Sequence, residues 1–177
     1  MKLIKTLSLI GLVILLAGSL TAKEPFHETV DFVDLERFSG DWYVIALMPT
    51  FIEKNAVNGI ENYTFDNEGK VHVEYTFFKN SPNGKRKLTT QRGWIINKES
   101  NADWRVQPLW PLRLPYYILD LADDYRYTVI GTNNYKYLWF MAREPKLSDE
   151  DYQGILTKLG DRGYNLDAIQ MMPQIWE

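Results

Sequence analysis

The chain has 177 residues, of which 45% are hydrophobic and 14% are aromatic, and its formal net charge is −3. A net negative charge argues against binding to a nucleic-acid backbone, so we expect no nucleic-acid partner. The chain contains no cysteine, so its stability comes from packing without disulfides, and its length fits one domain with a single core.

The first two dozen residues differ in composition from the rest of the chain. Lys2 and Lys5 precede an apolar run over residues 7–17, and small residues follow at 18–19. This order of charged, apolar and small residues is typical of a secretory signal peptide. The apolar run is shorter than the roughly 20 residues that a membrane-spanning helix needs, so we expect cleavage and not a permanent anchor.

We therefore expect residues 1–22 to be a signal peptide, cut between 19 and 22, and residues 23–177 to form one exported domain. Its net charge is −5, because two lysines and no acid are removed. The residues before Ser19 also resemble a bacterial lipoprotein signal in which serine replaces the lipid-accepting cysteine. A serine hydroxyl is no substitute for that thiolate nucleophile. We expect the periplasm or outer membrane of a Gram-negative bacterium as the location, without an acyl anchor.

Short runs of β-branched and aromatic residues, separated by turn-forming residues, fill most of the remaining chain. This pattern is typical of an antiparallel barrel or sandwich. Eight is the number of strands at which a closed barrel holds one small ligand. The sequence predicts eight strands, at residues 42–47, 60–65, 71–77, 88–96, 104–108, 116–121, 126–131 and 137–142.

The hydrophobic period changes after the eighth strand. Ser148 and Asp151 have the spacing of a helix cap, and Gly160 can end the helix that they begin. Apolar residues recur at helical spacing between these points. We expect one C-terminal helix outside the barrel, followed by a short edge strand within residues 169–175, which Pro173 limits.

Three blocks in this order resemble signatures of the lipocalin family. They are residues 40–43 (Gly-Asp-Trp-Tyr), residues 124–125 (Asp-Tyr) before a strand, and residues 137–143, which end in arginine. The chain is most similar to the bacterial outer-membrane lipocalins and the apolipoprotein D group. The resemblance implies an all-β fold, an eight-stranded antiparallel up-and-down lipocalin barrel with one C-terminal α-helix packed outside. It also implies a structural signature of Gly40, Trp42 and Arg143, in which the tryptophan closes the narrow end and the arginine lies across its indole.

Period-two alternation predicts which side chains line the cavity. Counting from Trp42 and from Arg143 sends alternate residues of the first and eighth strands inward, and the apolar faces of the third and fifth strands complete the wall. The resemblance also suggests that Asn62 projects into the cavity as a hydrogen-bonding group. Each of these residues either contacts ligand or fills the core. The expected ligand-binding residues are Val44, Ala46, Asn62, Val73, Tyr75, Phe77, Trp104, Val106, Tyr137, Trp139 and Met141.

An apolar, aromatic cavity favours a carrier or storage protein for a lipid or other small hydrophobic ligand, of the fatty acid or lysophospholipid class. Two loops, residues 48–52 and 109–117, are unusually apolar. The second contains Trp110 and Arg113. We expect these loops to make transient membrane contact, with the arginine at a lipid phosphate, to fold over the barrel mouth as a lid, or to do both.

An enzymatic function needs a catalytic constellation, and the sequence offers little for one. The histidines are His27, before the barrel, and His72, on the expected outer face of its strand. Neither is placed for a hydrolytic triad or a metal site. We expect no metal, no cofactor and no catalytic residue. The alternatives are a lipocalin-like enzyme that acts on a lipid through tyrosines and carboxylates, and a barrel used as a protein-interaction module.

Overall fold

The computed structural model describes residues 28–176, so the expected signal peptide and Ser19 lie outside the described residues. The helical elements are α1 (Leu35–Phe38), η1 (Asn133–Tyr135), α2 (Asp149–Asp161) and η2 (Leu166–Ala168). The strands are β1 (Gly40–Met48), β2 (Ala56–Phe65), β3 (Lys70–Lys79), β4 (Arg86–Ile95), β5 (Asp103–Leu109), β6 (Leu112–Leu121), β7 (Tyr127–Gly131), β8 (Leu138–Ala142) and β9 (Gln170–Met171).

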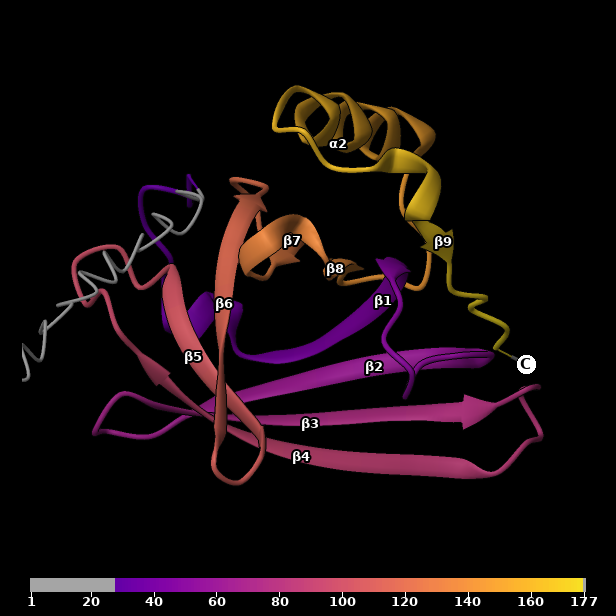
Figure 1. Ribbon diagram of the computed structural model, residues 1–177, viewed down its shortest axis with the longest axis horizontal. Coiled ribbons are helices and arrows are strands. Elements are labelled where there is room, and N and C mark those ends of the chain that lie inside the picture. The colour runs from indigo at the N-terminus through magenta and orange to yellow at the C-terminus, as the bar shows by residue number, and fades with distance from the viewer. Residues whose placement is uncertain (1–27, 177) are drawn as a thin grey trace, which may run out of the picture.

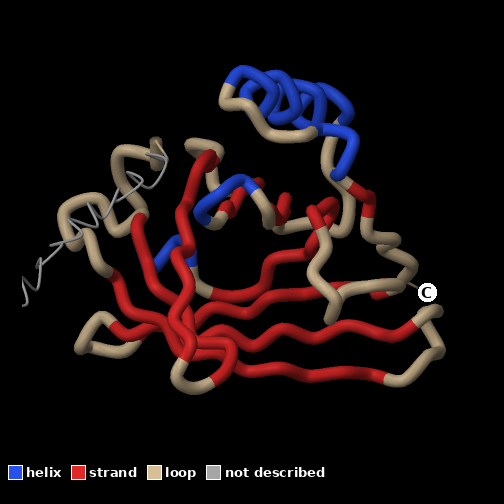
Figure 2. The backbone as a smooth tube through the Cα atoms, in the orientation of Figure 1, coloured by secondary structure: helices blue, strands red, loops and turns tan. Residues whose placement is uncertain are grey.

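The strands form one antiparallel sheet that closes on itself (Figure 1). Consecutive strands pair from β2 to β8, β8 pairs with β1, and β1 returns to pair with β2. This confirms the eight-stranded up-and-down barrel. Figure 2 shows the strands curving around the interior while the helical segments lie outside them or at the ends. Closure removes the free edges along most of the sheet. Strand β4 is the exception, because it pairs with β5 only over Arg92–Ile95 and its residues 86–91 have no pairing with that strand.

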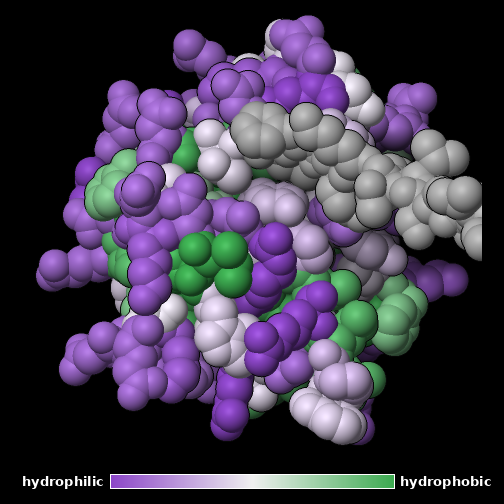
Figure 3. All heavy atoms as spheres, turned by 60° about the vertical axis from the view of Figure 1, so that its left-hand side comes forward, coloured by the Kyte–Doolittle hydropathy of each residue, from purple (hydrophilic) through white to green (hydrophobic). Residues whose placement is uncertain are grey.

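The barrel has a closed end and a mouth. The closed end contains α1 and the turns at residues 66–69, 96–102 and 122–126, and the mouth contains the loops at residues 49–55, 80–85, 110–111 and 132–137. The side of the molecule that carries the closed end is mainly hydrophilic, with smaller hydrophobic areas between the polar residues (Figure 3). Among residues 28–176, no helix has the length and apolar character that crossing a membrane requires.

Trp42 is fully buried at the closed end, beneath α1. Its indole nitrogen donates a hydrogen bond to the carbonyl of Phe38 at 2.8 Å, and the two rings lie 5.0 Å apart. The guanidinium carbon of Arg143 lies 3.7 Å from the centre of the indole. Such a cation–π contact contributes roughly 0.5–2 kcal/mol. The guanidinium also donates to three backbone carbonyls, those of Arg37, Ser39 and Asp41.

The helix α2 covers part of the outer surface of the barrel (Figure 1). Its buried residues Ile155 and Leu159 belong to a second hydrophobic cluster with outward-facing residues of β1, β7 and β8, among them Val129 and Phe140. The Ser148 hydroxyl accepts a hydrogen bond from the backbone N–H of Asp151, as the sequence predicts. The helix therefore shields apolar side chains on the outside of the barrel, separate from the interior.

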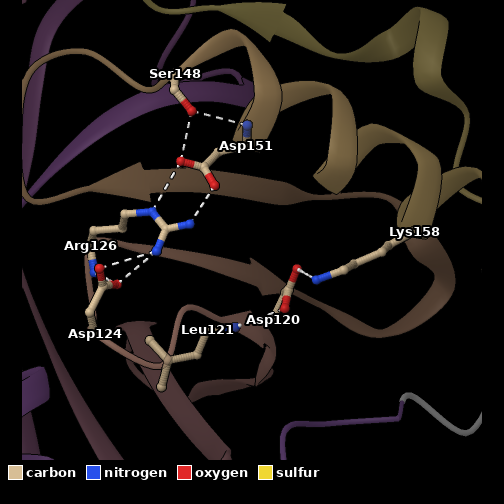
Figure 4. A network of polar contacts seen from close by, with 7 residues as sticks. All are labelled: Asp120, Leu121, Asp124, Arg126, Ser148, Asp151 and Lys158. Carbon is tan, nitrogen blue, oxygen red and sulfur yellow. Dashed lines mark hydrogen bonds and ion pairs between the residues drawn. The ribbon is translucent and has the colours of Figure 1, made fainter.

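Two ion pairs attach α2 to the strands beneath it (Figure 4). Arg126 lies between Asp124, in the turn before β7, and Asp151 of the helix, with nitrogen to oxygen distances of 3.1 and 2.7 Å. Lys158 donates to the carboxylate of Asp120 on β6 at 2.7 Å. Because these pairs are exposed to solvent, they orient the helix more than they stabilise it.

The C-terminal segment completes the barrel wall near the mouth. Strands β1 and β2 pair only over Gly40–Tyr43 and Ile60–Tyr63, and then separate. Beyond that point β9 pairs with β1, and the Met172 N–H donates to the carbonyl of Ile45 at 2.9 Å. On the other side, the Asn58 N–H donates to the carbonyl of Pro173 at 2.9 Å. The expected edge strand thus consists of two residues, and the tail beyond it bridges β1 and β2.

Gln174 holds both strands at once. Its side-chain amide donates to the carbonyl of Val44 at 2.7 Å and to the carbonyl of Gly59 at 3.1 Å. Gly59 also leaves room for the neighbouring Met172, because a Cβ at this position would overlap the methionine sulfur. The tail therefore depends on side-chain hydrogen bonds and on one close approach to the backbone.

Replacing Gln174 with alanine should loosen this segment. We expect Gln174→Ala to lower the free energy of unfolding by about 1–2 kcal/mol, because two carbonyls lose their donor. Urea unfolding measures the loss, and hydrogen exchange should become faster over residues 170–176. Gln153→Ala on the exposed side of α2 is the matched control and should change stability by less than about 0.5 kcal/mol. Equal effects of the two substitutions would contradict the bridging role.

Candidate functional site in the barrel interior

Most of the predicted wall residues belong to the hydrophobic cluster that fills and lines the barrel. Strands β3 and β5 contribute their apolar faces, and β8 contributes alternate residues. Tyr137 lies at the mouth, where it is 37% exposed and its ring centre is 6.4 Å from that of Trp139. The predicted residues within the interior cluster are Val44, Val73, Tyr75, Phe77, Trp104, Val106, Trp139 and Met141.

The predicted inward position of Ala46 is wrong. A β-bulge places one extra residue of β1 between the pairs Val44–Met141 and Ala46–Phe140, and this shift reverses the alternation. Ala46 consequently packs in the cluster beneath α2, and Leu47 takes the inward position.

The predicted inward position of Asn62 is also wrong. Its amide nitrogen donates to the carboxylate of Asp41 at 2.6 Å on the exposed outer side of the barrel. Its neighbours Glu61 and Tyr63 are buried instead, and Tyr63 belongs to the interior cluster. The polar group that β2 sends inward is therefore a carboxyl group and not an amide.

Glu61 forms a buried hydrogen-bonded cluster with two tyrosines. The hydroxyls of Tyr63 and Tyr116 both bond to Oε2 of Glu61, the second at 3.0 Å, and they bond to each other. Burial raises the pKa of the Glu61 carboxyl to about 7, hydrogen bonds from both phenols lower it in part, and the charge of Glu53 raises it. Burial also raises the pKa of both phenols. The tyrosines therefore stay protonated at neutral pH and act as hydrogen-bond donors, not as bases.

The second buried carboxyl group lies nearer the mouth. Oε1 of Glu53 accepts a hydrogen bond from the indole of Trp139 at 2.6 Å, and Oε2 accepts one from the N–H of Thr50 at 2.8 Å. Glu53 also lines a cavity of about 430 Å³ between the mouth loops and the C-terminal segment. This volume is in the range of small-molecule sites. Three residues of the cavity belong to the interior cluster, so the cavity borders the barrel interior: Leu47, Ala56 and Met172.

The inner face of β4 is polar. Directly paired residues of antiparallel strands project to the same face, and Val73, Tyr75 and Phe77 of β3 pair with Gln91, Thr89 and Lys87 of β4. These three β4 residues are half-buried, whereas the alternate residues of the strand that face outward are exposed. A side chain on the inner face keeps solvent exposure only where it borders open space. The barrel is therefore open beside β4 near its mouth.

Local patterns in the sequence could have revealed one of these missed residues. Alternation along β2 places Glu61 on the same face as Tyr63. A prediction that Tyr63 faces the interior therefore also predicts that Glu61 is buried. The polar face of β4 carries no such signal, because alternating polar residues ordinarily indicate the outside of a strand. Within residues 28–176, no group of three or more histidine, aspartate or glutamate side chains is arranged to bind a metal.

A closed eight-stranded barrel with one sealed end and a largely apolar interior that opens at the other end is the architecture of proteins that hold one small ligand. A family model described as a lipocalin-like domain matches residues 33–174. The chain therefore belongs to the lipocalin-like family.

Curated relatives and solved structures agree with this family. The chain is 29% identical to temperature-induced lipocalin-1 of Arabidopsis thaliana, over 83% of this chain and 82% of the relative. It is 24% identical to the outer membrane lipoprotein Blc of Vibrio cholerae, over 91% and 94% of the two chains. Insecticyanin of Manduca sexta has a similar structure, with a TM-score of 0.66, 16% identity and coverage of 86% of each chain.

Proposed function

We propose that this protein is an exported carrier of a single-chain lipid of the fatty acid or lysophospholipid class. The observation that carries the proposal is the inner wall near the mouth, where apolar and aromatic side chains of β3, β5 and β8 face a half-open interior. Burying each methylene of an acyl chain contributes about 0.8 kcal/mol, so a hydrocarbon tail is the ligand that this wall favours.

Export and location form a second part of the proposal. Residues 1–22 have the composition of a signal peptide, and the Vibrio cholerae relative carries the name of an outer membrane lipoprotein. We infer delivery to the periplasm or outer membrane of a Gram-negative bacterium. Ser19 occupies the position at which a lipoprotein signal has its cysteine, so we infer that the exported protein carries no acyl anchor.

Apolar side chains at the mouth favour transient contact with a membrane during loading. Trp110 and Phe51 are 82% and 89% exposed, and Leu109 and Leu112 beside Trp110 are also exposed. Exposed groups of large apolar residues commonly mark contact with a partner or a membrane. Arg113 stacks on the ring of Trp94 at 4.1 Å, which places its charge next to this loop.

Binding of a fluorescent fatty acid tests the carrier function. Ala56 lines the cavity at the mouth, and we expect Ala56→Phe to lower the affinity at least about tenfold because the larger ring occupies ligand space. Thr64→Phe places the same ring on the exposed outer face of β2 and should leave affinity unchanged. Thermal melting of both variants verifies that they fold. Equal affinities of the two folded variants would contradict binding at this site.

Native mass spectrometry of protein purified from its own envelope distinguishes the carrier from an enzyme. An intact copurified lipid supports the carrier. Conversion of an added lipid into a product would support an enzyme that uses the buried carboxyl and phenol groups of Glu61, Tyr63 and Tyr116, and would contradict the proposal.

A further inference from the structure

The inner face of β4 carries polar side chains, which are unexpected in the wall of a cavity that binds only hydrocarbon. Lys87, Thr89 and Gln91 face the interior at successive inward positions, with the lysine nearest the mouth. Their side chains make no hydrogen bond or ion pair with any residue in the range 28–176. The strand thus presents a cation, a hydroxyl and an amide to the open part of the barrel, all of them available to a ligand.

Cationic residues outnumber carboxylates around the mouth. Among the described residues, the mouth loops and the adjoining strand ends contain one carboxylate, that of Glu53, which is buried and hydrogen-bonded. They carry six cationic residues besides Lys87, namely Lys54, Lys79, Lys85, Arg86, Arg113 and Lys136. A cluster of one sign beside a low-dielectric cavity attracts ligands of the opposite charge and repels those of the same charge.

We infer that the mouth of the barrel contains a head-group subsite for an anionic single-chain amphiphile, with Lys87 pairing the acidic group and Thr89 hydrogen-bonding the polar atoms next to it. The hydrocarbon tail then lies along the apolar face of β3, against Val73 and Phe77. This inference rests on the proposed carrier function and specifies its ligand. The acid is a carboxylate or a phosphate monoester, because an ammonium pairs with either as a point charge.

Ligands that share one hydrocarbon tail and differ in their head groups test the subsite. Oleic acid, methyl oleate and oleoyl lysophosphatidic acid, presented at pH 8 from cyclodextrin, share one hydrocarbon tail. We expect the wild-type protein to bind one or both acids at least about tenfold more tightly than methyl oleate. A tenfold gain in affinity is the size of effect that one hydrogen bond to a charged group produces. The acid that binds more tightly identifies the head group as carboxylate or phosphate.

A substitution of Lys87 tests whether the preference for the acid over methyl oleate comes from the subsite. Lys87→Met keeps an unbranched side chain that is one atom shorter and removes its charge. It should lower the affinity for the preferred acid about tenfold while the affinity for methyl oleate changes less than about twofold. Lys98→Met, in an exposed turn at the closed end, is the control and should change neither affinity.

The outcomes separate the two proposals. Equal affinities for acid and ester in the wild-type protein, or an unchanged preference in folded Lys87→Met, would overturn the subsite and leave the carrier function standing. Absence of binding by all three ligands would overturn both.

Discussion

Replacing Trp42 with alanine is expected to lower the free energy of unfolding by about 3–5 kcal/mol, the cost of removing a large buried ring. Trp42 is fully buried at the closed end and packs on Phe38. The substitution also removes the indole donor from the Phe38 carbonyl and the ring face that Arg143 covers. The loss is a large fraction of the 5–15 kcal/mol typical of a domain. Urea unfolding followed by circular dichroism measures it.

Two further variants separate the contributions of Trp42. Trp42→Phe keeps an aromatic ring but loses the indole N–H, and we expect an intermediate loss of about 1–3 kcal/mol from the unpaired carbonyl of Phe38 and the smaller ring. Trp110→Ala removes an exposed tryptophan at the mouth and should alter stability by less than about 0.5 kcal/mol. A similar loss for the exposed and the buried tryptophan would show that Trp42 does not seal the barrel.

The second large effect concerns pH and Glu61. The folded protein holds this carboxyl with a pKa of about 7, whereas the unfolded chain has an ordinary glutamate pKa of about 4.3. The folded state therefore binds the proton more tightly. Its stabilising contribution is fully present below pH 4, declines as the pH rises toward 7, and is lost above that value. The difference amounts to roughly 3–4 kcal/mol, because each pKa unit corresponds to about 1.4 kcal/mol.

Glu61→Gln removes this dependence while keeping oxygen and nitrogen atoms for the two phenols. We expect the variant to be more stable than the wild-type protein at pH 8, by about 2–3 kcal/mol, and similar to it at pH 4. Glu74→Gln on the exposed outer face of β3 is the control and should match the wild-type protein at both values. Unfolding curves across this range measure the difference between variants. A constant difference at every pH would mean that Glu61 does not titrate in this window.

Much of the architecture could be predicted from local patterns. Short alternating runs predicted all eight barrel strands, and the capping residues Ser148 and Asp151 predicted the start of α2. The signature residues Trp42 and Arg143 are far apart in the chain and were expected to meet only because of the family resemblance. They lie in contact at the closed end. The positions of the strands can be predicted from the sequence alone, whereas the contact between Trp42 and Arg143 follows only from the family resemblance or from the tertiary structure.

The binding wall was harder to predict, because the face on which a side chain lies depends on the partner strand. The bulge at Val44–Ala46 exists only in the pairing of β1 with β8, and it exchanges Ala46 for Leu47 in the interior. The family resemblance predicts that Asn62 faces the interior, whereas the alternation along β2 buries its neighbours Glu61 and Tyr63 and turns Asn62 outward. A one-residue shift in register moves every following side chain to the other face.

The sequence by itself determined that this protein is a β-barrel with one trailing helix, because strand and helix periodicity are properties of neighbouring residues. Only the tertiary structure decided which polar groups face the interior. Lys87, Thr89 and Gln91 face inward through the register of β4 with β3, and the tail reaches Gly59 and Val44 from more than a hundred residues away in the chain. Such contacts depend on how distant segments pair, and the amino-acid pattern of either segment alone does not contain that information.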